Sequence, residues 1–221
     1  MRVSVAQMKP YYQSGGITIY HGDCREILPT LEPSSFDLCL TDPPYGVGYD
    51  YASYDDTPEN LVKLLGDVMP QLLRVAKRTL LTCGQRNIWK YPPADWVLCW
   101  NTPGGVSVTP WGFVCWQPIL AYGRKGPRDN GQLDGKPDFI SLNNQFASSD
   151  KHPCAKPIHV WEWLLCKGAP AAGQLVLDPF MGSGTTLRAA KNQGRRAMGI
   201  ELDEKYCEVA VERLAQEVLF T

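Results

Sequence analysis

Short apolar segments alternate along this chain with segments of amphipathic spacing, and this alternation constrains the fold more than any other feature. Helices are expected over residues 58–76, where Thr57 is a good N-cap and Pro58 a good first residue, over 157–167, and after Asp203. Strands are expected at 17–20, 36–41, 79–83, 95–101, 174–178 and 196–200. Such alternation typically produces a mostly parallel sheet with helices on both faces. We therefore predict an α/β fold.

The length of the chain suits one domain of this kind, spanning residues 1–221. A chain of 221 residues leaves no room for two full domains. Its 44% hydrophobic and 20% charged residues are typical of a soluble globular protein and exclude a disordered one. No apolar run approaches the ~18 residues of a membrane span, and the N-terminal segment is too polar for a signal peptide. We expect a cytoplasmic protein with no membrane partner.

The eight cysteines form no CxxC pair, and their spacing fits neither a zinc site nor a disulfide framework. Most of them lie among apolar residues, which predicts buried free thiols in a reducing compartment. No metal site is predicted.

The charge balance excludes a general nucleic-acid coat but leaves room for a local basic face. The net charge is −1. Two stretches are locally basic, and on charge alone we interpret them as solvated faces. The first stretch contains Lys63, Arg74, Lys77, Arg78, Arg86 and Lys90, and the second contains Arg124, Lys125 and Arg128.

Residues 102–155 differ from the rest of the chain, because they are rich in Gly, Pro, Asn, Ser and Asp. Residues 106–108 and 111–122 are expected to pair as strands of a hairpin, and 123–155 to form a long loop with little regular structure. Compact domains rarely carry such loops unless the loops bind or gate something. We therefore expect an inserted binding region here.

The loop Thr41-Asp42-Pro43-Pro44-Tyr45-Gly46 directly follows a predicted strand. It therefore lies at a strand's carboxyl end, where open α/β sheets bind ligands. The prolines stiffen the loop, and the Asp42 carboxylate and Pro43 carbonyl form a rigid pair of acceptors. Tyr45 adds an aromatic face. This combination favours a planar ring with an exocyclic amino group, although the same residues also form ordinary turns.

A second loop, from Asp178 to Thr186, joins a predicted strand to a helix through Gly182 and Gly184. Glycines let the backbone approach a ligand, and Glu201, 19 residues after Gly182, is well placed to accept ribose hydroxyls. The dinucleotide fingerprint fails because Leu187 stands at its third glycine, and a P-loop fails because no lysine follows the glycines. A nucleoside-like ligand without pyrophosphate is therefore predicted.

These motifs together resemble the amino-group DNA methyltransferases of the β arrangement, which use S-adenosylmethionine (SAM). DPPY stands at 42–45 and precedes DPFMGSGTT at 178–186, as in that family's circularly permuted order. The segment 152–157 resembles the family's HPxxKP motif, and Asp23 resembles the Asp of its GD segment, which contacts the cofactor adenine. The resemblance implies a circularly permuted, Rossmann-like class I methyltransferase fold, with 102–155 as a small inserted target-recognition region.

The resemblance also implies roles for individual residues. Catalytic roles are expected for Asp42, Pro43, Pro44 and Tyr45. Binding of SAM is expected for Asp23, Lys156, Asp178, Phe180, Gly182, Ser183, Gly184, Thr185 and Glu201. No covalent intermediate is needed, so the cysteines need no catalytic role.

Adenine N6 in double-stranded DNA is the expected target, because Asp42 resembles the adenine-specific members of the family. The base would be flipped out of the duplex to stack on Tyr45. Candidate DNA contacts are Arg86, Lys90, Arg124, Lys125, Arg128 and the loop up to Lys151, with Trp89 and Trp111 as exposed aromatics and Trp116 interpreted as core.

Cytosine N4 remains the alternative target, and a catalytically silent nucleic-acid-binding module of the same fold is the alternative from another class. A glutamine-N5 protein methyltransferase is disfavoured, because its Pro-Pro-Tyr loop usually opens with Asn and follows the glycine loop. A homodimer and a restriction endonuclease partner are left open.

Overall fold

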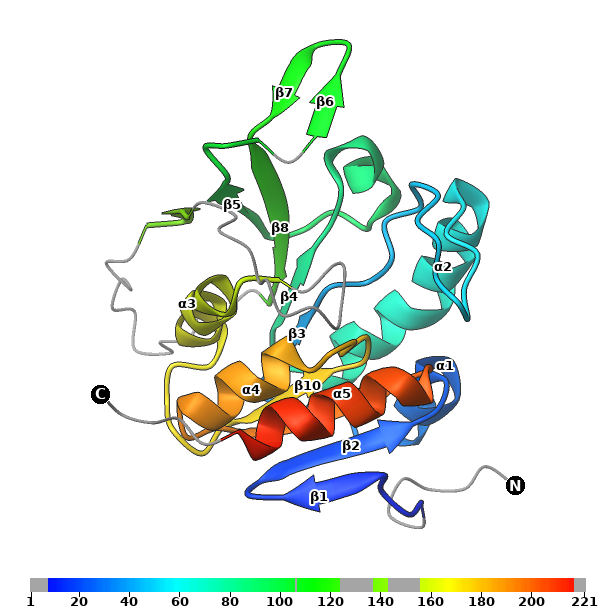
Figure 1. Cartoon of the computed structure of the whole chain (residues 1–221), viewed down its shortest axis with the longest axis vertical. Helices are drawn as coiled ribbons and strands as arrows, with labels where there is room; N and C mark the ends of the chain where they lie inside the picture. Colours follow the sequence, from blue (N-terminus) through cyan, green and yellow to red (C-terminus); the bar gives the residue numbers. More distant parts are fainter. Residues whose placement is uncertain (1–7, 106, 124–136, 143–155, 217–221) are drawn as a thin grey trace.

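The computed structural model describes residues 8–105, 107–123, 137–142 and 156–216 (Figure 1). Within these ranges, nine strands form one sheet in the order β1-β2-β11-β10-β3-β4-β8-β5-β9, and β6 and β7 form a separate hairpin. In Figure 1 this hairpin projects from one end of the molecule, and β1 and β2 lie at the opposite end.

The six predicted strands are all present, with ends shifted by at most two residues. They are β2 (Ile17–His21), β3 (Leu38–Thr41), β4 (Thr79–Thr82), β5 (Trp96–Asn101), β10 (Leu175–Asp178) and β11 (Arg196–Glu201). β3 begins later than expected because Phe36 makes only an isolated bridge with Ala76.

The sheet is mostly parallel, as predicted. Five of its pairs are parallel: β2 with β11, β11 with β10, β10 with β3, β3 with β4, and β5 with β9 (Phe139–Ser141). β1 (Tyr12–Ser14) runs antiparallel to β2, and β8 (Trp116–Tyr122) runs antiparallel to both β4 and β5.

Helices cover both faces of the sheet, which also agrees with the prediction. On one face lie α3 (Ile158–Gly168), α4 (Thr185–Asn192) and α5 (Glu204–Ala215), and on the other lie α1 (Cys24–Ile27), η2 (Leu28–Thr30) and α2 (Pro58–Val75). β3 shows the alternation, because Leu38 and Leu40 pack toward α3 whereas Cys39 packs toward α2. As expected, the Thr57 side chain caps α2 and Pro58 is its first residue.

The inserted region differs from its prediction in two respects. The single strand expected over 111–122 is divided at Cys115 into β7 (Gly112–Val114) and β8, because β7 pairs with β6 (Ser107–Thr109) whereas β8 pairs with β4 and β5. The loop expected over 123–155 contains β9, which adds to the sheet edge beside β5. Residues 124–136 and 143–155 lie outside the described ranges.

The expected burial of the cysteines is partly correct. Cys24, Cys39, Cys83 and Cys207 are buried free thiols, whereas Cys99, Cys115 and Cys166 are half-buried. Cys154 is not among the described residues. Trp116 was interpreted as core and is instead 42% exposed, because it is the first residue of β8 and lies at the end of the sheet, opposite the last residue of β5. No helix in the described part of the chain is long and apolar enough to span a bilayer.

The strand order reverses direction between β3 and β10, at the middle of the sheet. From β3 the chain passes through α2 to β4 on one side, and from β10 it passes through α4 to β11 on the other. The carboxyl ends of β3 and β10 therefore diverge into loops at adjacent positions. Open α/β sheets bind their ligands at such a reversal.

Candidate active site

The two predicted loops meet at this reversal and line one cavity. Asp42 and Pro44 come from the loop after β3, and Phe180, Gly182 and Ser183 come from the loop after β10. The empty space in the cavity and its open mouth together is about 1120 Å³. The spatial proximity that the sequence interpretation required is therefore present.

A buried carboxylate joins the two loops. Asp178, which is 3% exposed, accepts hydrogen bonds on Oδ1 from the Thr41 hydroxyl at 2.7 Å and from the Phe180 N–H at 3.1 Å, and on Oδ2 from the Thr186 hydroxyl. Burial raises the pKa of Asp178 to about 7, although these hydrogen bonds oppose the shift. Since Thr41 precedes Asp42 directly, Asp178 fixes the start of the first loop against the second.

Both carboxylate oxygens of Asp42 already face protein donors. Its Oδ1 accepts hydrogen bonds from the Tyr45 hydroxyl at 2.6 Å and from the Thr82 hydroxyl. Its Oδ2 lies 2.8 Å from Lys156 Nζ. Burial raises the pKa of Tyr45 well above its ordinary value, so the phenol stays protonated and donates to Asp42.

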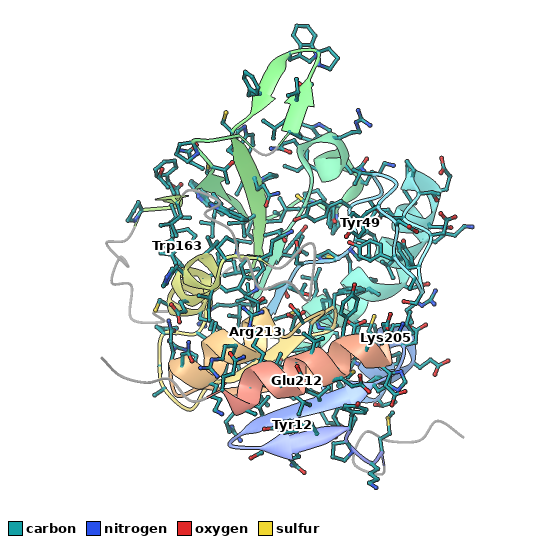
Figure 2. All side chains as sticks on the ribbon, in the orientation of Figure 1. Tyr12, Tyr49, Trp163, Lys205, Glu212 and Arg213 are labelled. Atoms are coloured by element: carbon teal, nitrogen blue, oxygen red, sulfur yellow. The ribbon has the colours of Figure 1, made fainter. Side chains whose placement is uncertain are left out.

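The turn that follows Tyr45 is held by a second buried carboxylate, that of Asp56, which is 2% exposed. Asp56 accepts three backbone N–H bonds, from Gly46 at 2.6 Å, Val47 at 3.0 Å and Tyr49 at 3.1 Å. From the other side, Asn87 Nδ2 donates to the Tyr45 carbonyl at 2.5 Å. Figure 2 labels Tyr49 in this turn, beside α2.

Glu201 holds the glycine loop in place. Its Oε2 accepts the Gly182 N–H at 2.9 Å, and its Oε1 accepts the Asp203 N–H at 2.9 Å. Burial raises the pKa of Glu201. Gly184 is the N-cap of α4 and has a φ of +77°, and a Cβ there would lie 2.9 Å from that of Ala210, so both conformation and space require glycine.

Asp23 also lines the cavity, and it is the N-cap of α1. It accepts the Arg25 backbone N–H at 2.8 Å and pairs with the Arg25 guanidinium at 2.6 Å. Burial acts to raise the pKa of Asp23, but the hydrogen bonds and charge of Arg25 outweigh it and lower the pKa. Tyr51 and Tyr54 add aromatic rings to the lining.

Most of the site residues predicted from the sequence line this cavity. They are Asp23, Asp42, Pro44, Lys156, Asp178, Phe180, Gly182, Ser183, Thr185 and Glu201. Pro43, Tyr45 and Gly184 are close by but do not line it. The other residues of the 152–157 segment, apart from Lys156 and Pro157, lie outside the described ranges, as do Arg124, Lys125, Arg128 and Lys151.

Sequence reasoning missed several residues that organise the site. Thr41, Thr82 and Thr186 donate to the two central carboxylates, and Asp56 and Asn87 hold the turn after Tyr45. Thr41 and Thr186 belong to the two loops singled out from the sequence but were given no role there, although their places in those loops were a usable signal. Asp56 and Asn87 carry no such signal, because only the folded chain brings them to the loop. Among the described residues, no group of three or more His, Cys, Asp or Glu side chains could hold a metal ion.

Comparison with known proteins agrees with this geometry. A family model for N6 and N4 methyltransferases, described as DNA methylase, matches residues 86–212. The type II methyltransferase M.ScaI of Streptomyces caespitosus is 28% identical over 259 residues, which cover 95% of this chain and 84% of M.ScaI.

Two solved structures share the fold. The M1.HpyAVI–SAM complex superposes with a TM-score of 0.67 at 23% identity, covering 90% of this chain and 100% of that one. The cytosine-N4-specific PvuII DNA methyltransferase superposes with a TM-score of 0.72 at 16% identity, covering 96% and 91%. The architecture is therefore that of these methyltransferases.

Proposed function

Because the chain belongs to the DNA methylase family that modifies N6 and N4 amino groups, we propose that it methylates the exocyclic N6 of a flipped adenine in double-stranded DNA. The family defines the reaction class, which is SAM-dependent methyl transfer to an amino group of a DNA base. Adenine as the target, and the role of each site residue, are our proposals.

One observation supports the proposal above the others: Asp42 and Gly182, from loops far apart in the sequence, line the same cavity. An amino-group methyltransferase requires an acceptor for the target amino group next to the site of the methyl donor. Asp42 has the required acceptor chemistry, and the glycine loop has the backbone conformation that a close ligand needs.

The chemistry of the residues that line the cavity suits SAM. SAM, when bound, supplies a methyl group on a positively charged sulfur. Glu201 and Asp23 offer carboxylates for ribose hydroxyls and adenine, and Phe180, Tyr51 and Tyr54 offer apolar faces for the adenine ring. Gly182, Ser183 and Thr185 at the start of α4 complete the proposed set, together with Asp178, which we propose acts by holding the loop.

Asp42 and Tyr45 are proposed to act on the target base. Asp42 Oδ2 and the Pro43 carbonyl would accept the two amino hydrogens, which holds the nitrogen with its lone pair directed away from the ring. The Tyr45 ring would stack on the base, and Pro43 and Pro44 keep the loop stiff. When the amino nitrogen gains a methyl group from a sulfonium it becomes positively charged, and that charge makes one of its protons acidic enough to pass to water. No strong base is therefore required.

The DNA-facing surface is proposed to be the end of the sheet where β3, β4 and β10 finish and β8 begins. The insertion at 102–155 is proposed as the target-recognition region. β8 enters the sheet beside η3 (Gln85–Lys90), which carries Arg86 and the 90% exposed Trp89. The β6-β7 hairpin extends farther in the same direction (Figure 1). Cations beside exposed aromatic rings suit phosphates and unstacked bases.

The decisive experiment identifies the methylated nucleoside. The protein is incubated with methyl-labelled SAM and unmethylated plasmid DNA, and the DNA is digested to nucleosides for mass spectrometry. We expect N6-methyladenine. Asp42→Ala serves as the negative control, because it removes the proposed acceptor. Label in N4-methylcytosine would transfer the proposal to the cytosine-N4 class, and absence of label with the wild-type protein would favour the silent binding module.

A further inference from the structure

Lys156 lies where the proposed function requires the target base. Its Nζ is 2.8 Å from Asp42 Oδ2 and 5.0 Å from the centroid of the Tyr45 ring. The Lys156 and Asp42 side chains are 17% and 23% exposed, so the pair is largely shielded from solvent. One ammonium group therefore makes two of the three contacts that the base is proposed to make, those with the Asp42 carboxylate and the Tyr45 ring, while the third is with the Pro43 carbonyl.

Neither carboxylate oxygen of Asp42 is free to bind the base without a change in the partners of that oxygen. Its Oδ1 already accepts the hydroxyls of Tyr45 and Thr82, which hold the carboxylate in one orientation. Oδ2 is the oxygen directed at Lys156. A stacked base and the Lys156 ammonium cannot occupy the same side of the Tyr45 ring, so entry of the base requires the lysine to move.

The charges explain why a cation occupies this position. Asp42 and Asp178 interact unfavourably, and Asp178 is fully enclosed. An unpaired Asp42 carboxylate beside it would be costly, and the Lys156 ammonium offsets that cost. The exocyclic amino group of a base carries no positive charge but donates to the same oxygen.

We propose that Lys156 is a positioning residue that lies in the target-base subsite and holds Asp42 in place until a flipped base displaces it. This inference rests on the proposed function. The family resemblance implied that Lys156 binds SAM, whereas this inference assigns Lys156 to the target-base subsite.

The test separates these roles with Lys156→Met, which keeps the length of the side chain but removes its charge. Kinetics are measured on the plasmid DNA that the wild-type protein methylates, and SAM affinity is measured by calorimetry without DNA. The base then enters without displacing a cation, so we expect KM for DNA to fall about fivefold, as for loss of a modest ion pair. The SAM dissociation constant is expected to stay within twofold.

Two further variants make the result specific. Lys156→Arg retains a cation and is expected to keep KM for DNA within twofold of wild type. Lys63→Met makes the same chemical change at an exposed position on α2 and is expected to change neither constant. If Lys156→Met does not fold, Lys156→Gln replaces it, with folding of each checked by its melting temperature.

A direct readout is the fluorescence of 2-aminopurine at the mapped target position in a duplex. Lys156→Met is expected to increase this fluorescence relative to wild type in the absence of SAM, because extrusion meets less competition. A rise of more than fivefold in the SAM dissociation constant, with KM for DNA unchanged, would assign Lys156 to the cofactor and overturn the inference. If the wild-type protein methylates no DNA, the proposed function itself has failed.

Discussion

At the scale of single residues, three carboxylates in and beside the site have different hydrogen-bond partners and therefore different roles. Asp42 is paired with a cation and two hydroxyls, Asp178 with two hydroxyls and one N–H, and Asp56 with three backbone N–H groups. Only Asp42 is directed at a group that a substrate could replace. Asp178 and Asp56 hold the two ends of the same loop, one before Asp42 and one after Tyr45.

Asp56→Asn should loosen the loop that contains Asp42 and Tyr45, with almost no change in side-chain volume at position 56. The asparagine Nδ2 would face a backbone N–H that now donates to Oδ1 or Oδ2, leaving at least one buried donor unsatisfied at a cost of about 1–3 kcal/mol. We expect a lower melting temperature and at least a tenfold loss of kcat, with SAM affinity within threefold of wild type. Asp50→Asn, an exposed position in the same turn, is the control. Equal kcat in the two variants would contradict the anchoring role.

Asp178 should make folding stability depend on pH. Its pKa is about 7 in the folded protein against an ordinary value of 3.8, so the folded state binds the proton more tightly. The stabilisation from this group is complete below pH 3.8 and is lost as the pH rises through about 7. Between pH 5 and 8 the wild-type protein should lose roughly 3 kcal/mol of unfolding free energy relative to Asp178→Asn, which cannot titrate. Urea unfolding at several pH values measures this difference, and parallel pH profiles would contradict it.

At the scale of elements, the parts of the fold with local signals could be predicted and the parts that depend on partners could not. α2 was identified because Thr57 and Pro58 mark its start whatever surrounds them. β9 was missed because three residues form a strand only when β5 is beside them. The break between β7 and β8 was missed for the same reason, since the sequence there is uniformly strand-like and only the change of partner divides it.

The β6-β7 hairpin is the element whose exposure most needs an explanation. Trp111 is 99% exposed, Phe113 77% and Val108 71%. Side chains at this end of the molecule project into open space in Figure 2. An apolar hairpin that supports no core is expected to serve a contact, and its position above the carboxyl end of the sheet favours DNA as that contact.

Replacing Trp111 and Phe113 by serine should therefore weaken DNA binding alone. Stacking of a base on an aromatic ring contributes about 1–3 kcal/mol, so affinity for plasmid-derived duplex should fall about tenfold or more. The melting temperature and SAM affinity should not change. Trp96→Ser, an exposed tryptophan at the far end of β5, is the matched control. Fluorescence anisotropy at fixed salt gives the affinities, and an equal loss in the control would show that general hydrophobicity is responsible.

At the scale of the whole molecule, the net charge of −1 means that attraction to DNA must come from local features. The basic stretch at 61–91 does not act as one surface. Arg74 donates to the carbonyls of Leu28 and Leu31, Lys77 pairs with Asp37, and Arg78 donates to Gly168. Its interpretation as a solvated face was wrong for Arg74 and Arg78, which are half-buried and donate to backbone carbonyls. It is correct for Lys77, whose side chain is 56% exposed. Composition cannot distinguish a cation that binds the protein's own carbonyls from one that is free to bind phosphate.

The meeting of the two loops could be predicted because motif order and sheet topology are linked. Each loop follows a parallel strand, and parallel strands present their carboxyl ends at one edge. The partners of each carboxylate could not be predicted in this way. Lys156 illustrates the limit, since its motif associates it with the cofactor whereas its ammonium lies on Asp42. A motif identifies which residues come together, but packing decides which atoms meet.

If base binding and cofactor binding occupy separate parts of one cavity, substitutions should separate them. SAM at 100 times its dissociation constant stabilises a protein by about 2.7 kcal/mol, which for this chain length raises the melting temperature by roughly 5–10 °C. Asp42→Ala should keep this shift and lose methyl transfer, because no hydrogen bond or ion pair among the described residues joins Asp42 to Glu201 or to the glycine loop. Glu201→Gln should lose most of the shift, since it disturbs the hydrogen bond to Gly182. The reverse pattern, in which Asp42→Ala abolishes the shift and Glu201→Gln keeps it, would mean that the two loops have exchanged roles. If SAM causes no shift in the wild-type protein, the chain is a binding module that does not bind this cofactor.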